Sequence, residues 1–185
     1  SNEQIRLYEN ARDQLEHNIS IIKDGKTFSW GGKHSDDYST RDTLYTDLGV
    51  FENYNPDIDQ SIDTEYLYLG NIQPSLQLDV INKIDKKKRI VSDTMNLWID
   101  IAADKLDLVV SQVNILFIND AEAQQYAKCN DLDEAATKLL AKGPEFVIIK
   151  RGEHGASLYS NRTTKHLPAF RVDDLSLIHI SEPTR

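Results

Sequence analysis

Polar and charged residues follow four short apolar runs of the sequence, at 66–70, 89–93, 115–119 and 146–150. These residues are Asn71, Asp93 with Asn96, Asn119 with Glu122, and Lys150 with Gly152 and Gly155. Their side chains and backbone amides suit phosphate, Mg²⁺ or a sugar hydroxyl. If the runs are strands of an open α/β sheet, the polar groups lie at the carboxyl ends, where such sheets bind ligands. Four polar strand ends therefore predict one shared cleft, although any single one is also explained as a helix cap or a turn.

Asn119 and Glu122 are the most informative pair among these residues. Residues three apart at a helix start can face one ligand together. A carboxylate there can bind Mg²⁺ directly or through water, because proteins hold Mg²⁺ with few carboxylates plus phosphate oxygens. Glu122 is therefore the candidate metal ligand. The alternative is a local helix-start interaction, in which Asp120 is the cap and the helix dipole favours Glu122.

The segment from Lys150 to Gly155 predicts a tight glycine turn. Its glycines allow close approach of the backbone to a ligand, and Lys150 can neutralise phosphate charge. The alternative is a plain hairpin turn. The sequence contains no GxxxxGK[ST] motif, which excludes a P-loop, and no GxGxxG after a predicted strand, which disfavours a Rossmann-type oxidoreductase.

Helical patterns separate the four apolar runs. They are expected at 75–84 with Ser75 as the cap, at 99–113, at 121–127, and from Asp131 to a stop at Gly143. The runs lack clean alternation, as in strands covered on both faces. Strand–helix alternation of this kind predicts an α/β fold with a mostly parallel sheet.

Both ends of the chain differ from this pattern. A hairpin of 156–160 with 166–170 is expected after the fourth run. Before the first run, a helix is expected at 4–17 and extended segments at 26–32 and 43–50. The latter, rich in Tyr, Trp, Thr and Asp, predict a small sheet over a cleft. Trp30 in this lid and Asn71 are the candidate substrate contacts, although tryptophan more often serves packing.

Composition bounds the function. The 185 residues are 39% hydrophobic and 28% charged, with a net charge of −9, which argues against nucleic-acid binding. A single cysteine, Cys129, rules out an internal disulfide and suits the cytoplasm. No apolar run reaches the length of a membrane span, and no secretory signal is visible.

The order of these motifs from about Gly25 to Val172 resembles the PfkB, or ribokinase-like, carbohydrate kinases. The resemblance implies a three-layer α/β sandwich with a small β lid at about 25–54, and ATP and Mg²⁺ as cofactors. It assigns Asn119 and Glu122 to the N-x-x-E motif that organises Mg²⁺ and phosphates, and Asp93 with Asn96 to the phosphoryl path. Lys150, Gly152 and Gly155 would border the nucleotide. It also implies a homodimer formed through the lid.

Two features of that family are absent from the sequence. The amino-terminal strand with its substrate-holding Asp and Gly-Gly is expected before Ser1. The D-T-x-G-A-G-D segment, which carries the anion hole and the catalytic base, is expected after Val172. The chain instead ends in LSLIHISEPTR, which resembles a translated sequencing adapter; the alternative is a genuine short strand at 175–180. Residues 1–174 are thus expected to be an incomplete kinase domain, and residues 175–185 a non-native tail.

The sequence therefore predicts part of an ATP-dependent carbohydrate kinase that transfers the γ-phosphoryl group to a hydroxyl of a sugar-like small molecule. Without the base, the chain itself is expected to be inactive. The alternative is a non-catalytic sugar- or nucleotide-binding module of the same fold. Fructose, ribose, a nucleoside and a sugar acid are all compatible substrates.

Overall fold

The computed structural model describes residues 22–34, 41–55, 58, 64–84 and 88–170. The chain divides into two units, Ser1–Asn55 and Pro56–Arg185, and each is described by itself. The helix expected at 4–17 and the tail at 175–185 lie outside the described residues.

The first unit contains a two-stranded antiparallel sheet. Strand β1 (Ser29–His34) pairs with β2 (Arg41–Asp47), and the 3₁₀ helix η1 (Gly49–Asn53) follows. The extended segments expected at 26–32 and 43–50 overlap these strands, but β1 begins three residues later than expected and β2 ends three residues earlier, before η1. The Trp30 indole N–H donates to the Thr43 hydroxyl at 3.3 Å across the pair.

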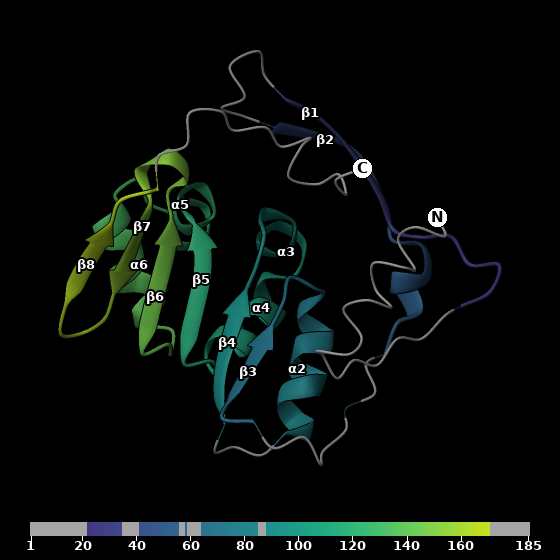
Figure 1. Cartoon of the computed structure of the whole chain (residues 1–185), viewed down its shortest axis with the longest axis horizontal. Helices are drawn as coiled ribbons and strands as arrows, with labels where there is room; N and C mark the ends of the chain where they lie inside the picture. Colours follow the sequence, from purple (N-terminus) through teal and green to yellow (C-terminus); the bar gives the residue numbers. More distant parts are fainter. Residues whose placement is uncertain (1–21, 35–40, 56–57, 59–63, 85–87, 171–185) are drawn as a thin grey trace. The chain divides into compact units, whose positions relative to one another are not determined.

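The second unit is built on a six-stranded sheet in the order β3-β4-β5-β6-β7-β8 (Figure 1). The strands are β3 (Tyr66–Leu69), β4 (Arg89–Asp93), β5 (Ile115–Asn119), β6 (Phe146–Lys150), β7 (Ala156–Tyr159) and β8 (Thr164–Leu167). Strands β3 to β6 are parallel, and β7 and β8 are antiparallel additions. The prediction of an α/β fold with a mostly parallel sheet is confirmed.

Five helices of this unit connect the parallel strands in the described part. They are α2 (Pro74–Lys83), α3 (Asn96–Ile101), α4 (Ala103–Val110), α5 (Asp120–Ala127) and α6 (Leu132–Leu140). None of the helices in the described ranges is long and apolar enough to cross a membrane.

Two helix predictions need correction. The single helix expected at 99–113 is two helices, broken at Ala102, which has a φ of −141°. Trp98 before the break and Leu106 after it are both buried. Ser75 is not a cap, because α2 begins at Pro74, which has no N–H to satisfy, after Gln73 without a side-chain cap. Asp131 caps α6 as predicted, accepting from the Glu134 amide at 2.8 Å.

The hairpin after β6 is confirmed, but its second strand begins two residues earlier than expected. Ser160 closes the turn, since its amide donates to the Thr163 carbonyl at 2.9 Å and its hydroxyl accepts from the Thr163 amide at 3.1 Å. Pro168, which has no N–H for a ladder, follows the last residue of β8.

The core lies between the sheet and the helices on one of its faces. Leu116, Ile118, Val147 and Ile149 of the two central strands have no exposed surface and pack against α4, α5 and α6. In Figure 1, α4 and α6 lie behind the sheet. Alternate strand residues on the other face are half-buried, and those of β3 are exposed. The described residues thus supply the sheet and one helical layer of the expected sandwich.

Candidate functional site

The carboxyl ends of β3 to β6 lie at one edge of the sheet, since the four strands are parallel and adjacent (Figure 1). The register aligns Asp93 with Phe117, and Asn119 with Lys150. The ends of β4, β5 and β6 therefore meet at this edge, as the sequence predicted. Asn71 follows β3 at the same edge.

An ion pair joins two of the predicted residues across β5. The Lys150 ammonium group lies 3.1 Å from Oδ1 and 3.0 Å from Oδ2 of Asp93. Oδ1 of Asp93 also accepts from the Thr94 amide at 3.0 Å. The Asp93 side chain is only 21% exposed, whereas that of Lys150 is 45% exposed. The Asp93 carboxylate is held in a defined orientation, with Lys150 accessible to an anion.

Asn119 and Glu122 form a capping box at the start of α5. The Asn119 side chain accepts from the Glu122 amide at 2.8 Å, and Glu122 Oε2 accepts from the Asn119 amide at 3.0 Å. Asn119, not Asp120, is therefore the cap; the Asp120 carboxylate accepts from the Ala121 amide instead. The local helix-start interaction is present, and it fixes Glu122 at the edge of the sheet.

Glu122 is a buried carboxylate close to both members of the ion pair. Burial raises the pKa of Glu122 above its ordinary value, and the negative charge of Asp93 acts in the same direction. The hydrogen bond from Asn119, the charge of Lys150 and the backbone N–H of Asn96 oppose that rise in pKa. Three charged groups and the start of α3 thus converge. With both carboxylates ionised, Asp93, Glu122 and Lys150 together carry a net negative charge.

This donor set fits Mg²⁺ in the manner usual for that ion. Asp93 and Glu122 offer carboxylate oxygens, and their negative charge exceeds that of Lys150. The described residues contain no group of three or more His, Cys, Asp or Glu arranged to hold a metal. Mg²⁺ keeps several waters and takes one or two carboxylates plus phosphate oxygens, so it does not need such a cage.

The two candidate substrate contacts differ in what surrounds them. Asn71 accepts from the Trp98 indole N–H at 2.8 Å, and its Nδ2 lies 3.0 Å from Met95 Sδ. These contacts tie the end of β3 to α3, next to the ion pair. Trp30 belongs to the first unit, so its role at the cleft stays a prediction.

The glycine turn between β6 and β7 joins two antiparallel strands. The hairpin turn that the sequence allowed as an alternative is therefore present. Gly152 and Gly155 have φ values of +50° and +83°. A Cβ on Gly155 would lie 2.0 Å from the Leu167 carbonyl oxygen, so this glycine accommodates the chain itself. A Cβ on Gly152 would meet nothing within 4 Å. Close approach of a ligand to the backbone stays a prediction for both glycines.

Sequence reasoning missed a buried polar residue beneath the site. Gln77 on α2 is 1% exposed. Its Nε2 donates to the Gly70 carbonyl at 2.9 Å and lies 3.3 Å from the Asp93 carbonyl, which ties the ends of β3 and β4 together. The signal was available, because Gln77 lies three and four positions before the apolar Val80 and Ile81 on the buried stripe.

We expect Asn119→Ala and Asp131→Ala to reduce the free energy of unfolding by similar amounts, about 1 kcal/mol each. Both side chains accept from the third amide of their helix, at 2.8 Å. Urea unfolding followed by circular dichroism measures the two losses. A much smaller loss for Asn119→Ala would contradict the capping box.

Glu122→Gln is expected to become more stable relative to wild type as the pH rises. Because its pKa is raised in the folded chain, Glu122 binds its proton more tightly when folded, and stability falls as the pH rises above the ordinary value. Glu145→Gln should show the opposite trend, because the hydrogen bond from Arg89 lowers the pKa of Glu145. Urea unfolding of the three proteins from about pH 3, below the ordinary glutamate pKa, to about pH 8 tests both signs, and parallel curves would refute them.

The comparisons with known proteins agree with this geometry. Residues 54–175 match the sequence model described as pfkB family carbohydrate kinase. A stretch of 117 residues is 29% identical to a cytidine kinase of Thermococcus kodakarensis, covering 62% of this chain and 41% of that protein.

Two solved structures share the fold. A nucleoside kinase of Burkholderia thailandensis, solved with inosine, aligns with a TM-score of 0.70 at 16% identity over 94% of this chain and 57% of its own. A ribokinase of Thermotoga maritima aligns with a TM-score of 0.65 at 18% identity over 95% of this chain and 59% of its own. The chain therefore spans about half the length of these relatives, and its ribokinase-like fold is confirmed.

Proposed function

The chain belongs to the pfkB family of carbohydrate kinases, and on that basis we propose that its carboxyl-edge cluster binds the phosphates of Mg-ATP for transfer to a substrate hydroxyl. The acceptor is a ribose-containing nucleoside or a related sugar. The cytidine kinase at 29% identity supports this class. The nucleotide and the acceptor would meet at the shared edge of β3 to β6.

The convergence of Lys150, Asp93 and Glu122 is the observation that supports this proposal. They come from three different elements, yet the ammonium lies 3.0 Å from one carboxylate and its charge acts on the other. A purely structural ion pair would not need a second, buried carboxylate beside it. Perturbed titratable groups that gather at the carboxyl edge of a sheet are typical of functional sites.

Each residue has a role that follows from its position. Lys150 offers its ammonium to incoming phosphate oxygens and shares it with Asp93. Asp93 and Glu122 would hold Mg²⁺, mostly through water, while Asn119 keeps Glu122 in place. When bound there, Mg²⁺ would offset the negative charge of the phosphates. The proton of the acceptor hydroxyl needs a base, and the D-T-x-G-A-G-D segment that carries it in this family is not in the sequence.

Binding without turnover is therefore the expected behaviour of the 185-residue chain. The amide signals of Gly152 and Asn119 and the indole signal of Trp98 are the reporters in a ¹⁵N–¹H NMR titration with Mg-ATP. The three signals should shift together as Mg-ATP is added. ATP in the presence of EDTA, or Mg²⁺ alone, should cause smaller shifts. The proposal would be contradicted if the largest shifts occurred at residues remote from this edge, or if no signal shifted at millimolar Mg-ATP.

A phosphorylation assay with a panel of nucleosides and sugars completes the test. We expect no phosphorylated product from this chain at any acceptor concentration. Robust turnover would show that another residue serves as the base. If a nucleoside or sugar shifts the signals without Mg-ATP doing so, the non-catalytic binding module becomes the better assignment.

A further inference from the structure

The ladder between β3 and β4 ends one residue before the candidate site. Leu69 lies opposite Ser92 in the parallel register, and this is the last pair of the two strands. The next residues along the strands are Gly70 and Asp93. Asp93 still pairs with Phe117 of β5, but the register places no β3 residue opposite it. The ladder therefore does not fix the spacing between the ends of β3 and β4.

The Gln77 carboxamide connects these two strand ends beyond the ladder. Its Nε2 lies 2.9 Å from the Gly70 carbonyl oxygen and 3.3 Å from the Asp93 carbonyl oxygen. A carboxamide NH₂ group has two hydrogens, so it can donate one to each carbonyl. The Ser92 hydroxyl lies 3.3 Å from the same Asp93 carbonyl and 3.4 Å from Nε2. Gln77 is 1% exposed and Ser92 has no exposed surface, so this network is closed to bulk water.

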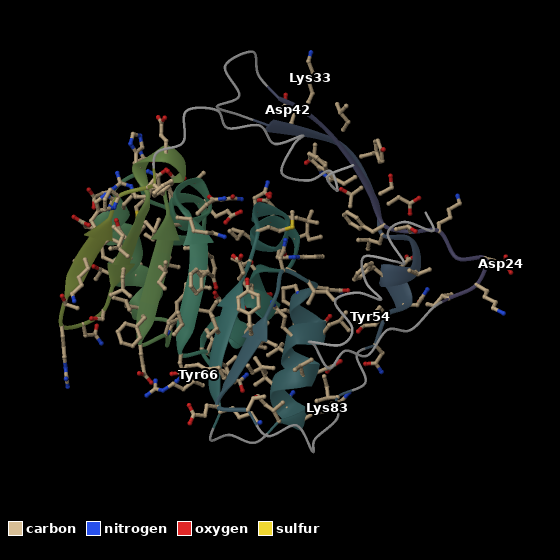
Figure 2. The ribbon with its side chains drawn as sticks, in the orientation of Figure 1. Asp24, Lys33, Asp42, Tyr54, Tyr66 and Lys83 are labelled. Carbon is tan, nitrogen blue, oxygen red and sulfur yellow. The ribbon has the colours of Figure 1, made fainter. Side chains whose placement is uncertain are left out.

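The direction of α2 brings Gln77 to this edge of the sheet. Figure 2 shows Tyr66, the first residue of β3, and Lys83, the last residue of α2, at the same end of the strands, away from the carboxyl edge. The helix therefore runs opposite to β3, and its first turn, which contains Gln77, lies near the carboxyl edge. Val80 and Ile81 of the same helix are also buried. An apolar side chain would suit that buried face as well, but it could not donate to a carbonyl.

We propose that Gln77 is a positioning residue that sets the spacing between the acceptor side and the phosphate side of the site. Gly70 directly precedes Asn71, the predicted substrate contact. The second carbonyl belongs to Asp93, whose carboxylate pairs with Lys150 at 3.0 Å. One buried side chain thus holds the backbone beneath both groups. This inference rests on the proposed function above. Because it is buried, Gln77 acts through the strand ends and not by touching either ligand.

Gln77→Met keeps the length of the side chain and removes both donors. We expect it to weaken Mg-ATP binding about 3- to 10-fold, the effect of one hydrogen bond of ordinary strength. It should also uncouple the end of β3 from the nucleotide, so that at equal occupancy the Asn71 amide signal shifts less than in wild type. The NMR titration with Mg-ATP measures both quantities. A glutamine with only a structural role would leave the Asn71 shift unchanged.

Asn114→Leu is the matched control. Asn114 directly precedes β5, at the opposite edge of the sheet, and its carboxamide also connects separate segments. Its Oδ1 accepts from the Ile90 amide at 2.8 Å, and its Nδ2 donates to Glu145 at 3.0 Å. Both variants should unfold at a lower urea concentration than wild type, since each loses a bridging carboxamide. Only Gln77→Met should lose affinity for Mg-ATP, and an equal loss in both variants would overturn the positioning role.

A second readout uses the unchanged chain, so it does not depend on how well a variant folds. The side-chain NH₂ signals of Gln77 should shift as Mg-ATP is added, because Gln77 contacts the Asp93 backbone, whereas those of Asn114 should not. If no signal at the carboxyl edge responds, the proposed function fails and takes this inference with it. If the Gly152 and Asn119 amides respond but the Gln77 NH₂ signals do not, or if Gln77→Met binds as wild type does, only the inference fails.

Discussion

Replacing Lys150 with methionine is expected to weaken Mg-ATP binding by roughly 100-fold while changing stability by no more than about 1 kcal/mol. Methionine keeps the length and the apolar stem of the side chain but removes the ammonium. The negative charges of Asp93 and Glu122 would then be offset at the phosphates by the bound Mg²⁺ alone, without the lysine. The loss in affinity is large because the effect combines a missing attraction with an added repulsion.

Lys142→Met is the matched control for that variant. Lys142 also forms an ion pair with an aspartate, Asp107, at 2.7 Å, and its side chain is 30% exposed. It lies after α6, away from the carboxyl edge. Both variants should lose little stability in urea unfolding, but only Lys150→Met should lose the NMR response to Mg-ATP. An equal response from both variants would mean that the Lys150–Asp93 pair is structural.

Gly155→Ala is expected to destabilise the chain by about 3 kcal/mol or more, because two penalties add. The φ of +83° disfavours any residue with a Cβ. The added Cβ would also lie 2.0 Å from the Leu167 carbonyl oxygen and 2.6 Å from the Ala169 amide nitrogen, both backbone atoms. The segment after β8 would have to move away from the turn.

Gly152→Ala separates the two penalties. Gly152 also has a positive φ, of +50°, but nothing lies within 4 Å of its added Cβ. Its expected cost is therefore only that of the backbone conformation, about 1 kcal/mol. Urea unfolding at 25 °C measures both losses. If Gly152→Ala were as harmful as Gly155→Ala, the close approach of the Leu167 backbone would not be the cause.

The elements of the second unit were predictable because each has a local signal. The runs at 89–93, 115–119 and 146–150 are strands over those same bounds. Asp131 begins α6 with a cap whose geometry depends on its own neighbours. The break at Ala102 had no such signal. Ala102 has a φ of −141° between the two helices, and nothing in the local residue pattern marks that position.

The sequence by itself determined that polar residues close four parallel strands, because residue type and strand bounds are local properties. It also determined that Asn119 and Glu122 interact, since they are three apart on one helix start. Only the tertiary structure decided that Lys150 pairs with Asp93 across β5 and that Gln77 ties two strand ends together. These contacts join residues on separate elements, and strand order and register bring them together. No periodicity along the chain carries that information.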